Sequence, residues 1–520
     1  MARAKNFLRG LGSGYLLLLG NTVWTLLSLP FALHFLGEGE YTVWLLVSQV
    51  ASYLAMIDLG TSGSGIRLLV DHKDAPDKGD YGSLIQSMCF TQLIQAGLIL
   101  ALGLGATSLL PRVMDNLPPA LVGDFQMLWI WQVIFLSMNF ALRIGNQILN
   151  AHQRIDISNC IQVGAFVLNL ALLLGCLQAG LRLYSFVIAQ GVSSLLMLLT
   201  LLAACVWLKL LPPRDAWGSV SRGHLKRLIG FGSEFFLIIL GTTLISGSQI
   251  ILLTRFLKPE VALEAALVWG VMTKPFTLCL QIVWKIVGAA TPAFSEMFVR
   301  GEMDRLWKRY RSVLELSVLL SGYLGLLIGF GNNAFIEVWT RKPFHWAPIN
   351  NWLLAVWLLL LAETCCHTSL ILYLKRVQAL KIVYLIEGAA FVLFSSVIIP
   401  RFGITGMLLC SIGCTLSLTW SYGTYRLSEL VEKPPRTVAV EWLLPLARFL
   451  AIMLPIGIVL GYFTRESSWL RLAGCVAPLA ILGPPIALRY CVPCDLLAEF
   501  ILRLPRWSRR LAGMLVGNPR

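Results

Sequence analysis

Four basic side chains lie inside long apolar stretches of this 520-residue sequence: Arg143, Lys274, Lys285 and Arg448. A charge near the centre of a bilayer costs about 2.5 to 3.5 kcal/mol on insertion scales, so each needs a partner, a water-filled cavity or a function. Arg448 is near the end of its stretch, where its side chain can reach the interface. The other three are deep, and Lys274 and Lys285, eleven residues apart, share one helix face. They predict a cationic patch for a phosphate or an acidic sugar, unless each pairs privately with an acid.

Deep acidic residues suggest proton or ion chemistry. Asp58 opens the segment 58–67 (DLGTSGSGIR), in which three glycines interrupt an apolar stretch. Such glycines permit either an unwound helix, as in transporters, or close helix packing. Glu363 and His367 are four residues apart on one helix face, so they either exchange a proton or satisfy one another as a buried pair. We predict Asp58, Glu363 and His367 as coupling or gating residues.

The elements that carry these residues are membrane spans. Hydrophobic residues make up 57% of the chain and charged residues only 13%, which excludes a soluble enzyme and a disordered chain. Because crossing the hydrocarbon core takes about 20 apolar residues, the sequence predicts an all-α polytopic membrane protein with about fourteen spans. The predicted spans are 11–36, 41–68, 83–110, 125–150, 155–177, 183–210, 229–257, 265–294, 313–338, 352–374, 383–399, 404–427, 442–463 and 469–487.

The positive charge of the chain is a topology signal. With the N-terminus inside, about 29 of the 42 Lys and Arg residues fall on the cytoplasmic side and about 9 outside. We therefore predict that both termini are cytoplasmic. Most of the formal charge of +15 then sets topology or meets anionic lipid headgroups, so no nucleic-acid partner is predicted.

Two halves of the chain resemble one another. LG at 19–20 and FL at 35–36 return at 240–241 and 256–257, and GAFVL at 164–168 matches AAFVL at 389–393. The offset of about 221 to 225 residues, with six spans in each half, predicts two six-helix lobes related by a parallel repeat. The predicted organisation is an N-terminal lobe (1–211), a cytoplasmic linker (212–228), a C-terminal lobe (229–428), two additional spans (429–490) and a basic cytoplasmic tail (491–520).

Motifs of soluble catalysis are missing from the sequence. It has no GxxxxGK[ST] phosphate loop, HExxH or GxSxG motif, and the predicted outside loops are too short for a catalytic domain. The single CxxC, at Cys491 and Cys494, is read as structural, and the other cysteines are scattered. We predict no enzyme, no bound metal and no cofactor beyond a coupling ion, H⁺ or Na⁺.

Several short motifs resemble one family of transporters. They are FLGEGEYTVW at 35–44, DLG at 58–60 followed by Ile66-Arg67, ATPAFSE at 290–296, GEMDRL at 301–306 and PRFGITG at 400–406. Their order across spans one to twelve resembles polysaccharide flippases of the multidrug/oligosaccharidyl-lipid/polysaccharide (MOP) exporter superfamily. The two six-helix lobes with two extra helices agree with that family.

The resemblance implies a bacterial inner-membrane transporter that flips an undecaprenyl-diphosphate-linked oligosaccharide to the outer leaflet by alternating access, for O-antigen, capsule or exopolysaccharide synthesis. It implies a cationic cavity, an ion gradient that resets the cycle, and a polysaccharide polymerase and a chain-length regulator as partners. From the motifs, Arg67 joins the substrate-binding candidates, and Asp58 and Pro292 are coupling or gating candidates. Gln249 stands where many relatives have an acid, so an ion site there is in doubt.

Two alternatives remain open. A multidrug/cation antiporter of the same superfamily requires an acidic cavity for cationic drugs, whereas three of the deep charges here are basic. An integral-membrane polysaccharide polymerase or glycosyltransferase usually has a large outside loop with catalytic residues, and the predicted topology has none.

Overall fold

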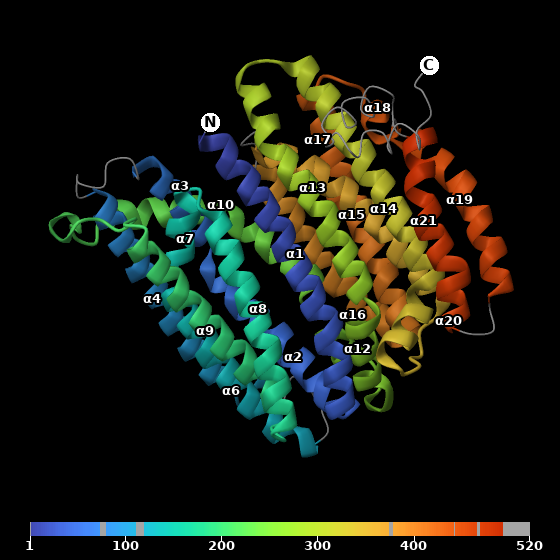
Figure 1. Cartoon of the computed structure of the whole chain (residues 1–520), viewed down its shortest axis with the longest axis horizontal. Coiled ribbons are helices and arrows are strands. Elements are labelled where there is room, and N and C mark those ends of the chain that lie inside the picture. Colours follow the sequence, from blue (N-terminus) through green and yellow to red (C-terminus); the bar gives the residue numbers. More distant parts are fainter. Residues whose placement is uncertain are drawn as a thin grey trace. The chain divides into compact units, whose positions relative to one another are not determined.

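The computed structural model describes residues 2–72, 80–110, 119–373, 378–440, 442–464 and 468–491, and these residues form helices and no strands (Figure 1). Cys494 and the rest of the predicted basic tail lie outside the described residues. Contacts divide the chain into two compact units, Met1–Leu267 and Val268–Arg520.

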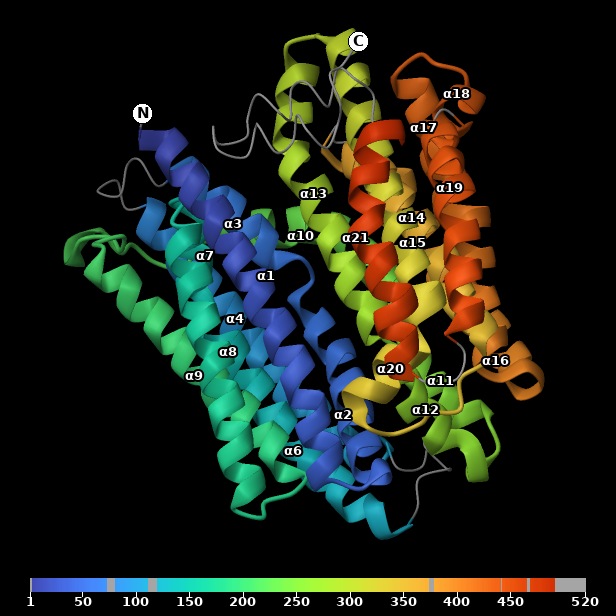
Figure 2. The same cartoon turned by 45° about the vertical axis from the view of Figure 1, so that its right-hand side comes forward.

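The first unit is built from paired apolar helices. Helices α1 and α8, α8 and α9, and α4 and α6 lie side by side (Figures 1 and 2). Its core joins α3, α4, α7 and α9 through buried side chains such as Leu69, Ile85, Ile148 and Leu201. Its elements are α1 (Ala2–Phe35), α2 (Glu38–Leu54), η1 (Ala55–Asp58), α3 (Thr61–His72), α4 (Asp80–Ala106), α6 (Pro119–Leu142), α7 (Ile144–Ala151), α8 (Ile155–Gln178), α9 (Tyr184–Trp207), η3 (Arg214–Ala216), α10 (Arg222–Ser246), α11 (Gln249–Phe256) and the start of α12 (Pro259–Met272).

The second unit packs around α14, which contacts α13, α15 and α19. A buried cluster that includes Phe330, Phe449, Met453 and Leu479 holds the last helices against it. Its elements are α13 (Lys274–Val299), α14 (Met303–Thr340), α15 (Pro348–Tyr373), α16 (Gln378–Thr415), η4 (Leu416–Trp420), α17 (Ser421–Leu430), α18 (Pro435–Val440), α19 (Leu443–Phe463), α20 (Ser468–Arg471), η5 (Leu472–Val476), α21 (Ala477–Ile486) and η6 (Ala487–Cys491).

The number of membrane-crossing helices agrees with the prediction. Twelve helical stretches of the described chain are long and apolar enough to cross a membrane, and a pair bent by 47° at Ser246–Gln249 adds a thirteenth. One of the twelve, Gln378–Leu430, has 53 residues but folds back on itself at Gly403, whose φ is 55°. Thr415 Oγ1 donates to Glu387 Oε1 at 2.8 Å, whereas a straight helix would separate these residues by about 42 Å. This stretch therefore forms two spans. The chain is an all-α polytopic membrane protein with about fourteen spans in its described part.

The division into units differs from the predicted lobes, in which the linker 212–228 separates the halves. Span seven, formed by α10 and α11, packs within the first unit. Ser64 Oγ donates to Leu228 O at 3.0 Å, and Ile250 N donates to Gln49 Oε1 at 2.8 Å. These contacts join the linker and span seven to span two. The two six-helix lobes and the parallel repeat that relates them stay predictions.

Candidate functional site

The second span is broken directly after Asp58. Helix α2 tightens into the η1 turn, and the next two residues, Leu59 and Gly60, have φ angles of 48° and 72°. A Cβ atom on Gly60 would lie 2.5 Å from Gly232 O of α10, so only glycine fits here. The predicted interruption is confirmed at Gly60. Gly65 instead has a packing role, because a Cβ there would lie 2.4 Å from Met88 Cε.

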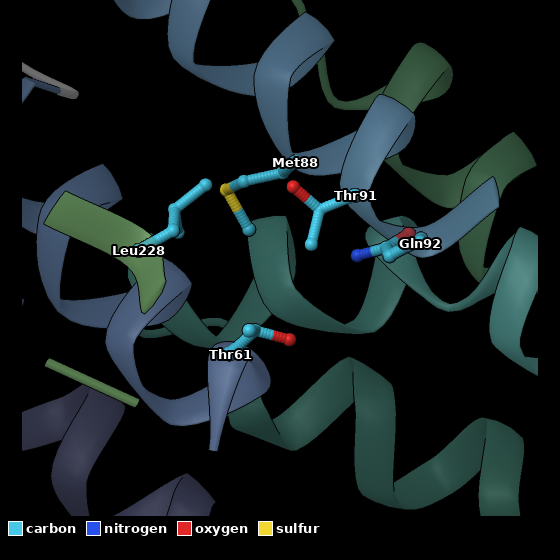
Figure 3. A pocket seen from close by; sticks show the side chains of 5 residues that line it. All are labelled: Thr61, Met88, Thr91, Gln92 and Leu228. Carbon is cyan, nitrogen blue, oxygen red and sulfur yellow. The ribbon is translucent and has the colours of Figure 1, made fainter. Parts of the chain in front are cut away.

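A polar crevice lies beside this break (Figure 3). Its lining comes from α3, α4 and α10 and consists of Thr61, Met88, Thr91, Gln92 and Leu228. The crevice is too narrow to hold a water molecule. Gln92 Nε2 donates to Gln147 Oε1 of α7 at 2.7 Å, while the buried Gln92 Oε1 has no partner in the described part of the chain. The crevice itself therefore has no room for a substrate in this structure.

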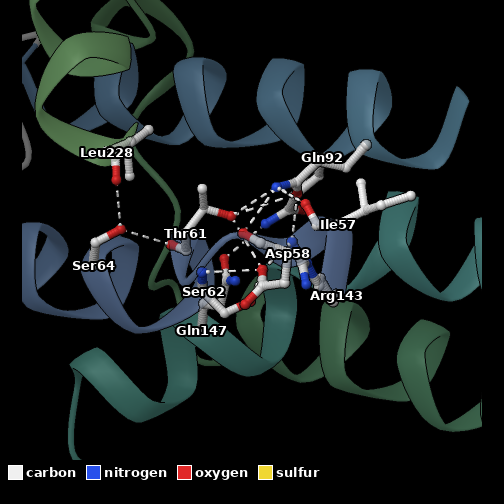
Figure 4. Close-up of polar contacts among 10 residues, drawn as sticks. Ile57, Asp58, Thr61, Ser62, Ser64, Gln92, Arg143, Gln147 and Leu228 are labelled. Carbon is white, nitrogen blue, oxygen red and sulfur yellow. Dashed lines mark hydrogen bonds and ion pairs between the residues drawn. The ribbon is translucent and has the colours of Figure 1, made fainter. Parts of the chain in front are cut away.

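The Asp58 carboxylate caps the helix that follows the break (Figure 4). Its Oδ1 atom accepts from Ser62 Oγ at 2.9 Å, Thr61 Oγ1 at 3.1 Å and Ser62 N at 3.3 Å. An acidic side chain at a helix N-terminus satisfies free N–H groups and opposes the positive end of the helix dipole. Asp58 therefore stabilises the start of α3.

Arg143 completes the site from the single residue between α6 and α7, two helices of one continuous candidate span. Its Nη2 atom lies 2.7 Å from Asp58 Oδ1 and donates to Gln95 Oε1 at 2.6 Å. The guanidinium also lies 4.1 Å from the ring centre of Phe140. The side chains of Arg143 and Asp58 are 16% and 21% exposed, so the ion pair is mostly shielded and its hydrogen bonds are charge-assisted.

Gln95 of α4 is the residue of this site that sequence reasoning missed. Its Nε2 atom donates to Ile57 O at 2.9 Å and to Asp58 O at 3.0 Å, carbonyls that the broken helix leaves free, and also lies 3.1 Å from Thr61 Oγ1. Gln92 and Gln95, three residues apart inside an apolar span, were the available signal, since amide side chains in spans commonly bond between helices.

The arrangement holds Arg143 as an ion pair. The sequence left open whether Arg143 belongs to a cationic patch or pairs with an acid of its own. The observed state is the second, because Asp58 neutralises the guanidinium. Separation of Asp58 from Arg143 by a movement of span two would free the guanidinium for an anionic group.

The remaining predicted substrate residues are distributed over both units. Lys274 is the first residue of α13 and is half-buried, Lys285 lies further along the same helix and is exposed, and Arg67 is exposed on α3. Among the described side chains, none forms an ion pair with Lys274 or Lys285. Pro292 lies within α13, and its side chain is outside the described ones. A shared cavity for Arg143 and the two lysines stays a prediction.

Glu363 and His367 lie together on α15, with 3.5 Å between Glu363 Oε1 and His367 Nε2. This separation is too long for a good hydrogen bond. The carboxyl oxygens instead accept from the indoles of Trp420 and Trp442, at 2.5 and 2.6 Å. The observed geometry is that of a buried, hydrogen-bonded acid, and a coupling role stays a prediction. No three His, Cys, Asp or Glu side chains within the described ranges could hold a metal ion.

Several solved structures of membrane transporters have a similar fold. A structure of the lipid II flippase MurJ in an inward closed conformation matches 96% of this chain and 100% of its own, with a TM-score of 0.66 and 12% identity. An inward-facing multidrug resistance MATE family transporter of the MOP superfamily matches 79% of this chain and 95% of its own, with a TM-score of 0.64 and 15% identity. The chain has the MOP superfamily fold.

A third structure with the MOP fold is a transporter from Pyrococcus furiosus whose binding pocket is described as having reversed polarity. It matches 82% of this chain and 95% of its own, with a TM-score of 0.54 and 15% identity. No family model and no curated protein match the sequence. The MurJ match omits 4% of this chain, about 21 residues, whereas the last two spans, Pro435–Phe463 and Ser468–Cys491, hold 53 residues. It therefore includes most of those spans, so the fourteen-span form of the fold has a solved counterpart.

Proposed function

We propose that this protein is a secondary transporter that flips an undecaprenyl-diphosphate-linked oligosaccharide from the cytoplasmic to the outer leaflet by alternating access. The observation that carries the proposal is the extent of the MOP fold, which here includes the last two spans and matches a lipid II flippase over 96% of the chain. The MATE transporter reported above matches 79%. A flippase for a related lipid-linked sugar accounts for both the fold and the additional spans.

The charges inside the membrane support an anionic substrate. Asp58 and Arg143 neutralise each other, so they offer no net charge in the observed state. Lys274 and Lys285 form no ion pair with the described side chains, and they could bind a diphosphate as point charges. A multidrug/cation antiporter would need an excess of acid here, so the lysines favour the flippase over that alternative.

The setting of the proposed function follows from the same reading. The protein would lie in the bacterial inner membrane with both termini in the cytoplasm, supply a surface-polysaccharide pathway with its substrate, and work beside a polymerase and a chain-length regulator. Protons or sodium ions would reset the cycle. Transport without bond formation requires no catalytic residue, so we propose no enzymatic activity.

An export assay tests the proposal. The chain is expressed in a bacterium that lacks its own flippase and carries the matching glycan pathway, and surface polysaccharide is measured. Lys285→Ala should abolish export, and Lys285→Arg should retain part of it because the positive charge remains. Normal export by the Arg143→Ala, Lys274→Ala and Lys285→Ala variants would refute the cationic cavity. Drug resistance without export would favour the antiporter, and new glycosidic bonds made by the purified protein would favour an enzyme.

A further inference from the structure

The buried acid of α15 holds three separate segments of the second unit together. Trp420 comes from η4, a π-helical turn in span twelve, and Trp442 directly precedes α19, the first of the two additional spans. Each indole N–H donates to a different oxygen of Glu363. Glu363 is 1% exposed and Trp442 is 9% exposed. The additional spans are therefore tied to the rest of the unit by a buried polar contact at the start of α19.

His367 lies near one of these oxygens without donating a hydrogen bond to it. The imidazole is fully buried, and its Nδ1 atom lies 2.5 Å from the hydroxyl of Tyr310 on α14. Its Nε2 atom has no hydrogen-bond partner among the described residues, although it lies 3.5 Å from Glu363 Oε1, the oxygen that Trp442 occupies. Buried polar atoms are rarely left without a partner, so an unpaired one calls for an explanation.

Two donors within reach of one acceptor suggest two states. While Trp442 occupies Oε1, His367 Nε2 is unsatisfied. If α19 moved away and took Trp442 with it, a shift of less than about 1 Å would bring Nε2–H within hydrogen-bond distance of Oε1. The Tyr310 contact on Nδ1 would favour the tautomer that keeps the proton on Nε2. In one state the His367 Nε2–H lacks an acceptor, and in the other the Trp442 indole N–H does. The buried Oε1 atom of Glu363 accepts a hydrogen bond in both states.

We propose that Glu363 is a positioning residue whose Oε1 atom exchanges between Trp442, when the two additional spans are docked, and His367, when they are released. The docked contact is observed, and the use of the released state during transport rests on the proposed function. A polar switch of this kind gives a packed interface two discrete arrangements rather than a continuous range. His367 would thus stabilise the released state, although it lies in the core of the docked one.

Hydrogen–deuterium exchange of the full-length protein in lipid nanodiscs, without substrate, tests the switch. Peptides that cover residues 435–446 report docking, and peptides from α14 report global opening. His367→Asn keeps a polar atom for Tyr310 but loses the nitrogen that faces Glu363. Because the released state would lose its only donor on Oε1, exchange in residues 435–446 should slow by at least about tenfold, the low end for a hydrogen bond to a charged group. His367→Gln, which can place a donor near the lost Nε2, is the matched control and should exchange like the unmodified protein.

A purely structural role for His367 predicts the opposite sign. Faster or unchanged exchange in residues 435–446 of the His367→Asn variant, with α14 peptides unchanged, would overturn the switch. If that variant does not fold, His367→Ala is used instead, with its exchange corrected by that of the α14 peptides. The switch again predicts slower exchange in residues 435–446, and a structural role predicts faster or unchanged exchange. Loss of polysaccharide export is measured separately, so failure of the flippase proposal and failure of the switch give different results.

Discussion

Removing the Asp58 carboxylate should destabilise the protein mainly by leaving Arg143 without its counter-charge. In Asp58→Ala the guanidinium keeps its hydrogen bond to Gln95 and its contact with the Phe140 ring but has no counter-charge, and an unpaired charge in a span costs about 2.5 kcal/mol. Loss of the cap on α3, where Oδ1 accepts from Thr61 and Ser62, adds about 1 kcal/mol. We expect a total loss of about 3.5 kcal/mol.

A second substitution should return part of this stability. Met keeps much of the aliphatic length of Arg143 without its charge, so Asp58→Ala/Arg143→Met loses the cap and the Gln95 hydrogen bond, about 2 kcal/mol together. The double variant should therefore be more stable than Asp58→Ala by about 1.5 kcal/mol. Asp58→Asn, which keeps an oxygen for Thr61 and Ser62, isolates the contribution of the charge.

Unfolding rates in SDS, measured on purified protein in mixed micelles, give the comparison. Since about 1.4 kcal/mol corresponds to a factor of ten, the double variant should unfold up to about tenfold more slowly than Asp58→Ala. If it unfolds as fast or faster, Arg143 has another sufficient partner and the ion pair does not organise the site. Additive effects of the two single substitutions would refute the coupling in the same way.

Two further outcomes follow from the structure. Gly60→Ala should strongly reduce the yield of folded protein on fluorescence-detected gel filtration, because φ is 72° and the new Cβ would lie 2.5 Å from Gly232 O. Gly63→Ala is the control and should give a normal yield, because nothing lies within 4 Å of its new Cβ. Equal yields of the two variants would contradict the strained break. Burial, with the nearby charges of His72 and Arg227, lowers the pKa of His224 in the first turn of α10. The unfolded chain therefore takes up a proton first, and the thermal midpoint should fall as pH drops below about 6.5. His224→Gln should remove part of that dependence, and identical pH profiles of the two proteins would contradict it.

The apolar blocks were sufficient to predict the architecture. About twenty apolar residues per block allow a membrane crossing whatever the neighbours are, and the structure has about fourteen such helices. The glycines after Asp58 were visible as a candidate break or packing site in span two, and the positive φ at Gly60 in the structure decides for the break. The boundary between units was not visible in this way, since it depends on which surfaces span seven contacts.

Side-chain pairing could be predicted only within one helix. The four-residue spacing of Glu363 and His367 placed them together on α15, but nothing in the sequence indicated that Trp420 and Trp442 would take the carboxyl oxygens. Those residues are 57 and 79 positions away from Glu363. Their meeting depends on how three helices are rotated and how deep each lies.

The sequence by itself determined the helical membrane architecture, the presence of a glycine-rich segment after Asp58, and the presence of charges that need partners or a function. The tertiary structure alone decided that Arg143 is neutralised by Asp58 and held by Gln95. The physical reason is that spans which are apolar on most faces carry no periodic signal of their own rotation, so sequence gives the depth of a charge and not its neighbours. Packing fixes that rotation, and with it which charges are paired within the protein and which could bind a substrate.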